Sequence, residues 1–361
     1  MTVRWRQPLV RGQTASHGRC PNRARGLIHE HHPRSPGHRN NTGLSSLKSQ
    51  KGPAVMDQQR EKLGLLYGIL GMVGFSLTLP ATRVSVEYFG TTAVGLGRGL
   101  LAGLLAILLV LIFRLPRPNR AEFKELALLA GGAVIGFPYL SSWSMDRLPA
   151  SHGAIVLALL PLVTAGIARW REGEHPSRLF WLCSLAGSLI IMGYALIQGA
   201  GRLQSADLIL FAGVVLSAYG YAIGGRLTRT RGALWVVSWA LIVPLPLTAI
   251  PGVLAIWQQG ADAPLTAWIS LIYLGAGSQL LAWILWCLGL SLGGIAKVSQ
   301  VQLVQPFLTI ILSALLLHEP ITLLTVGAAL LVIVTVAGGQ KSPVKMAQKP
   351  MIMGGEDVHQ A

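Results

Sequence analysis

Polar side chains recur along one face of an apolar stretch near the end of the chain, residues 294–317. On a wheel of 100° per residue they share an arc of about 120° with one proline: Ser299, Gln302, Gln305, Pro306, Thr309 and Ser313. Amides and hydroxyls are costly in lipid, so they are expected to face the interior of a helix bundle. Two interpretations stay open, a path for a polar solute or simple hydrogen bonds between helices.

Arg98 is the one charge well inside the first four apolar runs, and Gly95, Gly99 and Gly103 surround it. An arginine in a membrane segment is costly. It could bind an anionic or carboxylate group of a solute. It could equally serve as a structural partner for backbone carbonyls, or snorkel to the surface. The small residues allow close helix packing within or between chains, which leaves a homodimer open.

Aromatic and polar residues also coincide in two further apolar runs, 125–144 and 267–289. They are Tyr139, Ser141 and Trp143 in the first run and Gln279 and Trp283 in the second. Such residues could line a mixed polar and apolar pocket. Anchoring at the membrane interface explains Trp143 equally well.

Catalytic chemistry finds little support. The stretch 289–293, GLSLG, fits the nucleophile pattern G-x-S-x-G but lacks its strand–turn–helix context. Phosphate-binding loops and metal-ligand spacings are absent, so we predict no catalytic residues, metal or cofactor. His152 and His318 could couple to protons, but no carboxylate partner is indicated. The cluster His29–His32 is more typical of a solvated tail than of a metal site.

Composition indicates a membrane protein. The 361 residues are 52% hydrophobic and only 12% charged, against about 25% charged in soluble domains. Of the net charge of +16, residues 1–55 supply ten Lys or Arg against one acid, so the basic tail is no evidence for nucleic-acid binding. Residues 1–62 are predicted to form a basic, disordered N-terminal extension. Met56 lies one short polar segment before the first apolar run, and we expect translation to start there.

Ten apolar runs of bilayer-spanning length follow. They cover residues 64–82, 93–113, 125–144, 149–169, 179–198, 206–226, 233–256, 267–289, 294–317 and 321–338. Alternate connections hold ten cations, Arg114, Arg117, Arg120, Lys124, Arg169, Arg171, Arg178, Arg226, Arg229 and Arg231. The opposite connections hold only Arg83, Arg147 and Arg202. The positive-inside rule therefore predicts that both termini, and the polar tail 340–361, are cytoplasmic.

An internal repeat organises these runs. Pro161 and Pro306 lie 145 residues apart, as do Glu174 and Glu319. The prolines could simply kink their helices or form the hinge of a gate. Each glutamate precedes the next helix, where we expect it to cap free N–H groups. Five helices per copy would invert the second copy, so residues 63–199 and 200–339 predict an inverted repeat, a transporter architecture with alternating access.

The second copy, from IYLGAGSQ to VTVAG (272–338), resembles the EamA-type family of the drug/metabolite transporter superfamily. The first copy resembles it through Arg98, Pro161 and Glu174. The resemblance covers about residues 64–338 and implies ten helices and export or exchange of small metabolites or drugs. The segment 72–83 departs from the family's usual first helix.

Together these features predict an all-α membrane protein, a secondary transporter rather than an enzyme, in the cytoplasmic membrane. Its partners would be a small-molecule solute and the lipid bilayer, with no nucleic acid. The alternative is a structural or sensing membrane protein that keeps the fold without transport.

Overall fold

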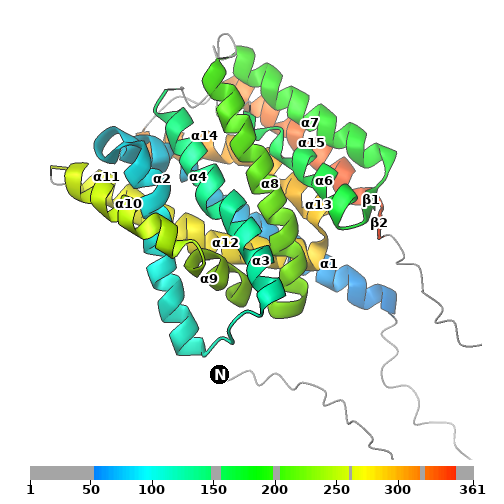
Figure 1. Ribbon diagram of the computed structural model, residues 1–361. Coiled ribbons are helices and arrows are strands. Elements are labelled where there is room, and N and C mark those ends of the chain that lie inside the picture. Colours follow the sequence, from blue (N-terminus) through cyan, green and yellow to red (C-terminus); the bar gives the residue numbers. More distant parts are fainter. Residues whose placement is uncertain (1–52, 148–155, 198–203, 260–261, 318–321, 347–361) are drawn as a thin grey trace, which may run out of the picture. The chain divides into compact units, whose positions relative to one another are not determined.

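The computed structural model describes residues 53–147, 156–197, 204–259, 262–317 and 322–346, and these are almost entirely helical (Figure 1). Before residue 200 the elements are α1 (Pro53–Ser76), α2 (Thr78–Phe113), α3 (Arg120–Ala130), η1 (Gly131–Gly136), α4 (Phe137–Met145), α6 (Leu160–Arg171), β1 (Glu174–Pro176) and α7 (Arg178–Ile197). Glu319, His318 and His152 and the basic stretch 1–52 lie outside these residues, so the expectations made for them remain expectations.

The elements after residue 200 are α8 (Ser205–Arg231), α9 (Ala233–Ile242), α10 (Leu245–Gln259), α11 (Leu265–Ile272), η2 (Tyr273–Ala282), α12 (Trp283–Gly293), α13 (Ile295–Ser299), η3 (Gln300–Val304), α14 (Gln305–Leu317), α15 (Leu323–Lys341) and β2 (Val344–Met346). Among the described residues, five helices are long and apolar enough to cross a membrane, or six if the pair α9 and α10 is counted as one bent span. That pair bends by 62°. Pro244 and Pro246 lie at the bend, where proline removes helix hydrogen bonds.

Two boundaries differ from the sequence-based expectation. Residues 53–62, assigned to a disordered extension, form the first turns of α1. The expected connection 83–92, with Arg83, is helical and belongs to α2, whose one non-helical residue is Gly90 with φ 72°. Glycine adopts that backbone conformation without steric cost, so the chain can turn there without a loop.

The two halves of the chain share one packed core, because helices of the first half pack directly on helices of the second half. Helix α1 packs on α12, α2 on α10, and α7 on α15, as Figure 1 shows for α7 and α15. The α1–α12 contact is a seam of glycines: a Cβ on Gly289 would lie 2.6 Å from the backbone nitrogen of Gly68. Small residues let helix backbones approach this closely in membranes, where apolar burial alone gives little specificity.

The largest buried cluster lies where these helices meet, with Trp286, Phe180, Leu126 and Leu210 at its centre. Leucines and isoleucines on α2, α7 and α15 are instead exposed, which is the pattern of a lipid-facing surface. Strands β1 and β2 form a small antiparallel sheet in which Glu174 is opposite Met346. It ties part of the expected polar tail to the connection after α6, which the sequence did not indicate.

Candidate functional site: a central cavity between the two halves

A cavity lies between the halves, with about 60 Å³ of room for the centres of water molecules. A site needs about 10–15 Å³ by this measure to hold one water, so several would fit. Eight lining residues come from the first half, Phe75, Thr78, Leu79, Arg98, Ala133, Phe137, Leu157 and Leu160. Eight come from the second, Ser217, Tyr221, Ser278, Gln279, Trp283, Gln302, Gln305 and Pro306.

Irregular backbone surrounds this cavity. The helix breaks at Leu77, whose ψ is 0°, and again at a turn at residues 158–159. The π-helices η1 and η2 and the 3-10 helix η3 contribute Ala133, Gln279 and Gln302. In a membrane, non-helical backbone is tolerated where it is buried in protein or lines a cavity. Several helices therefore change their winding where they meet the cavity.

The break after α1 leaves backbone acceptors that α14 satisfies. Pro80 has no N–H, so the carbonyl of Ser76 lacks its usual helical donor. The hydroxyl of Thr309 donates to that carbonyl, and Nε2 of Gln305 donates to the carbonyl of Phe75 at 3.3 Å. These two predicted solute-path residues thus make interhelical hydrogen bonds, and Gln305 also lines the cavity.

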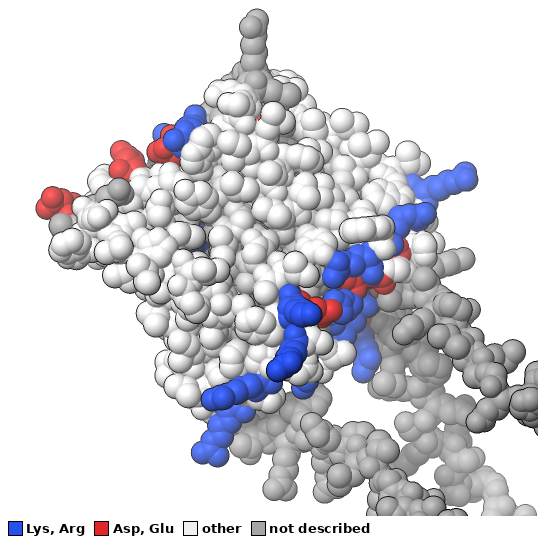
Figure 2. All heavy atoms as spheres, in the orientation of Figure 1, with Lys and Arg blue, Asp and Glu red and all other residues white. Residues whose placement is uncertain are grey.

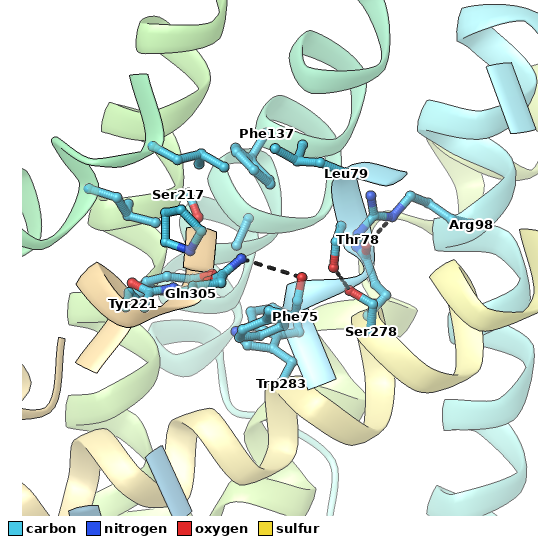
Figure 3. Close-up of a pocket in the computed structure, with 16 residues that line it drawn as sticks. Phe75, Thr78, Leu79, Arg98, Phe137, Ser217, Tyr221, Ser278, Trp283 and Gln305 are labelled. Atoms are coloured by element: carbon cyan, nitrogen blue, oxygen red, sulfur yellow. Dashed lines mark hydrogen bonds between the residues drawn. The ribbon is translucent and has the colours of Figure 1, made fainter. Parts of the chain in front are cut away.

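Arg98 and Gln279, both predicted site residues, meet at the cavity wall. Nε of Arg98 donates to Oε1 of Gln279 at 2.7 Å, although the two residues are 181 positions apart. The arginine is 3% exposed, so it does not snorkel to the surface. Beside it, the hydroxyls of Thr78 and Ser278 are 2.8 Å apart, as Figure 3 shows on the same side of the cavity.

The rest of the wall is mostly aromatic and aliphatic. Figure 3 shows Phe137 and Leu79 on one side of the cavity and Phe75 and Trp283 on the opposite side. Phe75 stacks on Tyr221 with ring centroids 6.4 Å apart, so packing fixes both rings. The cavity therefore has a charged, polar end at Arg98, an aromatic and aliphatic body, and a second, uncharged polar group at Ser217, Tyr221 and Gln305 on the far side (Figure 3).

The remaining predicted pathway residues do not line the cavity. The hydroxyls of Ser299 and Ser141 donate to carbonyls of their own helices, those of Ala296 and Pro138. Trp143 lies under the guanidinium of Arg147, 3.9 Å from the ring centroid.

Tyr139 and the two predicted prolines lie at a helix contact and at two helix starts. The backbone of Tyr139 packs closely on α2, since a Cβ on Gly95 would come within 2.9 Å of its Cα. Pro306 lines the cavity at the start of α14, and Pro161 occupies the first turn of α6 beside the lining residue Leu160. Proline is favoured in the first turn of a helix because its missing N–H would have no partner there.

Sequence reasoning missed ten of the lining residues. Four are polar, Thr78, Ser217, Tyr221 and Ser278, and six are apolar, Phe75, Leu79, Ala133, Phe137, Leu157 and Leu160. Thr78 had a usable signal, because it lies two residues before Pro80 inside an apolar run. A proline there marks a helix break, and polar side chains gather at such breaks. Tyr221 and Ser217 carried no comparable signal on the long helix α8.

Ion pairs join the two halves at one end of the molecule, where Figure 2 shows most of the visible Lys and Arg side chains together. We call these pairs the ionic ties: Arg226 with Glu125 and Glu172, Arg229 with Glu174, Arg231 with Glu122, and Lys297 with Glu61. In each tie the acid precedes residue 200 and the base follows it. Burial raises the pKa of Glu172 above its usual value, although Arg226 lies against its carboxylate.

Glu174 has a second role at this end. Its carboxylate accepts hydrogen bonds from the backbone N–H groups of Ile295 and Ala296, at 2.9 and 2.7 Å. It therefore caps α13 of the second half, instead of α7, the next helix, as the sequence had suggested. A carboxylate at a helix N-terminus satisfies free N–H groups and interacts favourably with the helix dipole.

The family relationship follows from comparison with known sequences. The EamA-like transporter family matches residues 62–198 and, a second time, residues 204–338. The chain belongs to this family. With its apolar helices, it is thus a multi-pass membrane protein and a transporter of the drug/metabolite type.

Individual relatives of this EamA protein agree with that assignment. An uncharacterized transporter, YdeK of Bacillus subtilis (strain 168), is 37% identical over 278 residues, covering 77% of this chain and 97% of YdeK. A probable terminal-alkyne amino-acid exporter of Streptantibioticus cattleyicolor is 26% identical over 274 residues, covering 73% of this chain and 88% of the exporter. A crystal structure with 17% identity aligns with TM-score 0.63 over 77% of this chain and 98% of its own, which supports the fold alone.

Proposed function

We propose that this EamA protein is a secondary transporter that exports a small organic solute across the cytoplasmic membrane by alternating access. The solute site would be the central cavity. The observation that carries this proposal is that each half of the chain supplies eight of its lining residues. A site shared by two halves can be exposed to either side when the halves rock against each other. One relative is named as a probable amino-acid exporter, which supports export of a small organic solute.

Ten helices arranged as two inverted repeats, residues 63–199 and 200–339, belong to this proposal. Support comes from the matching irregularities of the two halves. Regular helix resumes at Leu160 with Pro161, and at Gln305 with Pro306, and these two starts are 145 residues apart. Each half also contains one π-helix within its described residues, η1 and η2. If the chain contains two copies of one five-helix unit, equivalent helices are expected to have their irregular turns and their breaks at equivalent positions.

The orientation that we propose places both termini and the ionic ties in the cytoplasm. The ties lie on the connections that hold most of the loop cations, which the positive-inside rule assigns to the cytoplasmic side. Because each tie joins the first half to the second, opening the cavity toward the cytoplasm would require the ties to break. The ties would then act as a cytoplasmic gate.

Gln302→Leu is expected to separate transport from stability. Gln302 is 6% exposed and its Oε1 has no hydrogen-bond partner among the described residues. Leucine of similar size removes an unsatisfied polar atom but also the contact of the Gln302 side chain with the hydroxyl of Tyr221, so the unfolding temperature should change little. Losing one hydrogen bond to the solute should lower flux about tenfold. The solute is first identified by metabolite analysis of the medium of an overexpressing strain, and flux is then measured by counterflow in proteoliposomes.

The matched control for this experiment is Gln258→Leu on the exposed side of α10, which should leave both flux and stability unchanged. Unchanged counterflow in the Gln302→Leu variant would contradict the cavity as solute path. Saturable solute binding without flux in the unsubstituted protein would favour the alternative, a sensing protein with this fold.

Neutralising the gate arginines Arg226 and Arg229 should open the cavity toward the cytoplasm. The arginines of these ties are partly exposed but the carboxylates of Glu172 and Glu174 are buried, so each tie contributes more than the about 0–1 kcal/mol of a fully exposed pair. The double change should therefore shift the equilibrium several-fold or more, and the unfolding temperature is measured beside it to show that the chain stays folded. The measurement is the rate at which a charged thiol reagent labels Ser217→Cys in inside-out vesicles, in a background without the three native cysteines. Arg114→Gln at the end of α2 is the control. Faster labelling from the opposite membrane face instead would overturn the proposed orientation.

A further inference from the structure

The cavity contains a buried positive charge without a described counter-charge. Arg98 is 3% exposed, and its Nε is bonded to a neutral amide, that of Gln279. Its Nη1 has no partner among the described residues. No acidic side chain lines the cavity in the described part of the chain. A buried charge left without an opposite charge is strongly destabilising, so a bound anion would remove that cost.

The unsatisfied polar atoms around the cavity are mostly donors. Nε2 of Gln279 and Nε1 of Trp283 have no described acceptor, and neither does Nη1 of Arg98. Oε1 of Gln279 accepts from Arg98, and this contact determines which end of the amide is oxygen and which is nitrogen. The NH₂ group then has no acceptor among the described residues. Only Gln302, through Oε1, offers an unsatisfied acceptor on this wall. Three donors and a positive charge suit a group that carries only acceptors, as an ionised acid does.

The shape of the cavity limits the rest of the solute. Arg98, Thr78 and Ser278 lie together at one end, and Phe137 and Phe75 lie on opposite sides of the body, as Figure 3 shows. A single arginine balances one negative charge but not two. A planar carboxylate offers two acceptor oxygens, which match guanidinium and amide N–H groups. An aliphatic or aromatic body would pack between the two phenylalanines.

We infer that the solute is a small organic monoanion whose carboxylate binds the guanidinium group of Arg98 and the side-chain amide of Gln279. This inference rests on the proposed function, because it assigns the solute class of the same cavity. Arg98 is the residue that selects charge, and the aromatic wall selects an apolar body. A neutral solute of the same shape would leave the guanidinium without a counter-charge.

Binding is tested with the purified full chain in lipid nanodiscs, using acetate, butanoate and 3-phenylpropanoate as probes. The neutral amide of 3-phenylpropanoate and chloride serve as matched probes. The readouts are fluorescence of the tryptophans, one of which is Trp283, and the unfolding temperature. We expect saturable binding that is tightest for 3-phenylpropanoate and at least about tenfold weaker for its amide. Arg98→Gln should weaken carboxylate binding about thirty-fold or more and leave amide binding unchanged.

If Arg98→Gln does not fold, Arg98→Lys and Gln279→Leu replace it. Lysine keeps the charge and should retain part of the carboxylate preference, whereas Gln279→Leu should lose about tenfold in carboxylate affinity. Equal binding of amide and carboxylate, binding of chloride alone, or no binding of any carboxylate would overturn the inference. Counterflow distinguishes the two proposals. Transport of neutral solutes only would overturn the monoanion inference but support the transport function. Carboxylate binding without flux would support the monoanion inference but contradict the transport function.

Discussion

Gly289→Ala is expected to destabilise the protein by about 1–3 kcal/mol, the usual cost of overpacking. A Cβ at this position would lie 2.6 Å from the nitrogen of Gly68, 2.8 Å from its Cα and 2.9 Å from the carbonyl oxygen of Gly64. All three are backbone atoms of α1, so no side chain can rotate away and the helices α1 and α12 must separate. The measurement is the midpoint of unfolding of the purified protein, by heat or by denaturing detergent.

The matched controls are Gly166→Ala on α6 and Gly327→Ala on α15. A Cβ at either position meets no atom within 4 Å. Alanine is favoured over glycine inside a helix by up to about 1 kcal/mol, so these variants should be neutral or slightly more stable. The predicted change in stability is therefore negative for Gly289→Ala and zero or positive for Gly166→Ala and Gly327→Ala. A similar change at all three glycines would mean that α1 and α12 do not pack backbone to backbone.

Glu174→Ala should be the most destabilising single change at the charged end, at about 3 kcal/mol or more. The side chain is 1% exposed and accepts from Ile295 N–H, Ala296 N–H and Nη2 of Arg229, the last at 3.1 Å. Alanine would leave two buried backbone donors without acceptors. Arg229 is partly exposed and can turn to water, so its share of the cost is small. Thermal unfolding and the yield of folded protein both report this loss.

Glu174→Gln separates charge from hydrogen bonding, because it keeps one acceptor oxygen. Its stability should fall between those of Glu174→Ala and the unsubstituted protein. Glu87→Ala, at an exposed position on α2, is the control and should change stability by less than about 0.5 kcal/mol. If Glu174→Ala unfolds at the same temperature as Glu87→Ala, Glu174 does not hold α13 in place.

Helix positions were largely predictable because lipid demands long apolar runs. Runs 206–226 and 321–338, for example, correspond to α8 and α15 within a few residues. That Gln302, Gln279, Trp283 and Arg98 line the cavity was predictable for the same reason, since a polar or amphipathic side chain in such a run needs a partner or a cavity.

Ser299 does not line the cavity, and its sequence position gives no reason for this. Its hydroxyl donates to the carbonyl of Ala296 in its own helix. The residues that follow, Gln300–Val304, form the 3-10 helix η3, which a wheel of 100° per residue does not describe. The helix that Glu174 caps could not be predicted from the sequence either, because Ile295 is 121 residues away from Glu174 along the chain. Only the packing of the two halves brings them together.

The backbone break after α1 links the water content of the cavity to the movement of α14. The carbonyls of Phe75 and Ser76 accept from Gln305 and Thr309. An unsatisfied backbone group in a bilayer costs several kcal/mol, so α14 can move away only if other donors take over. Water or solute in the adjoining cavity can supply them. A dry cavity would then hold α14 against α1, and filling it would lower the barrier to separating the two halves.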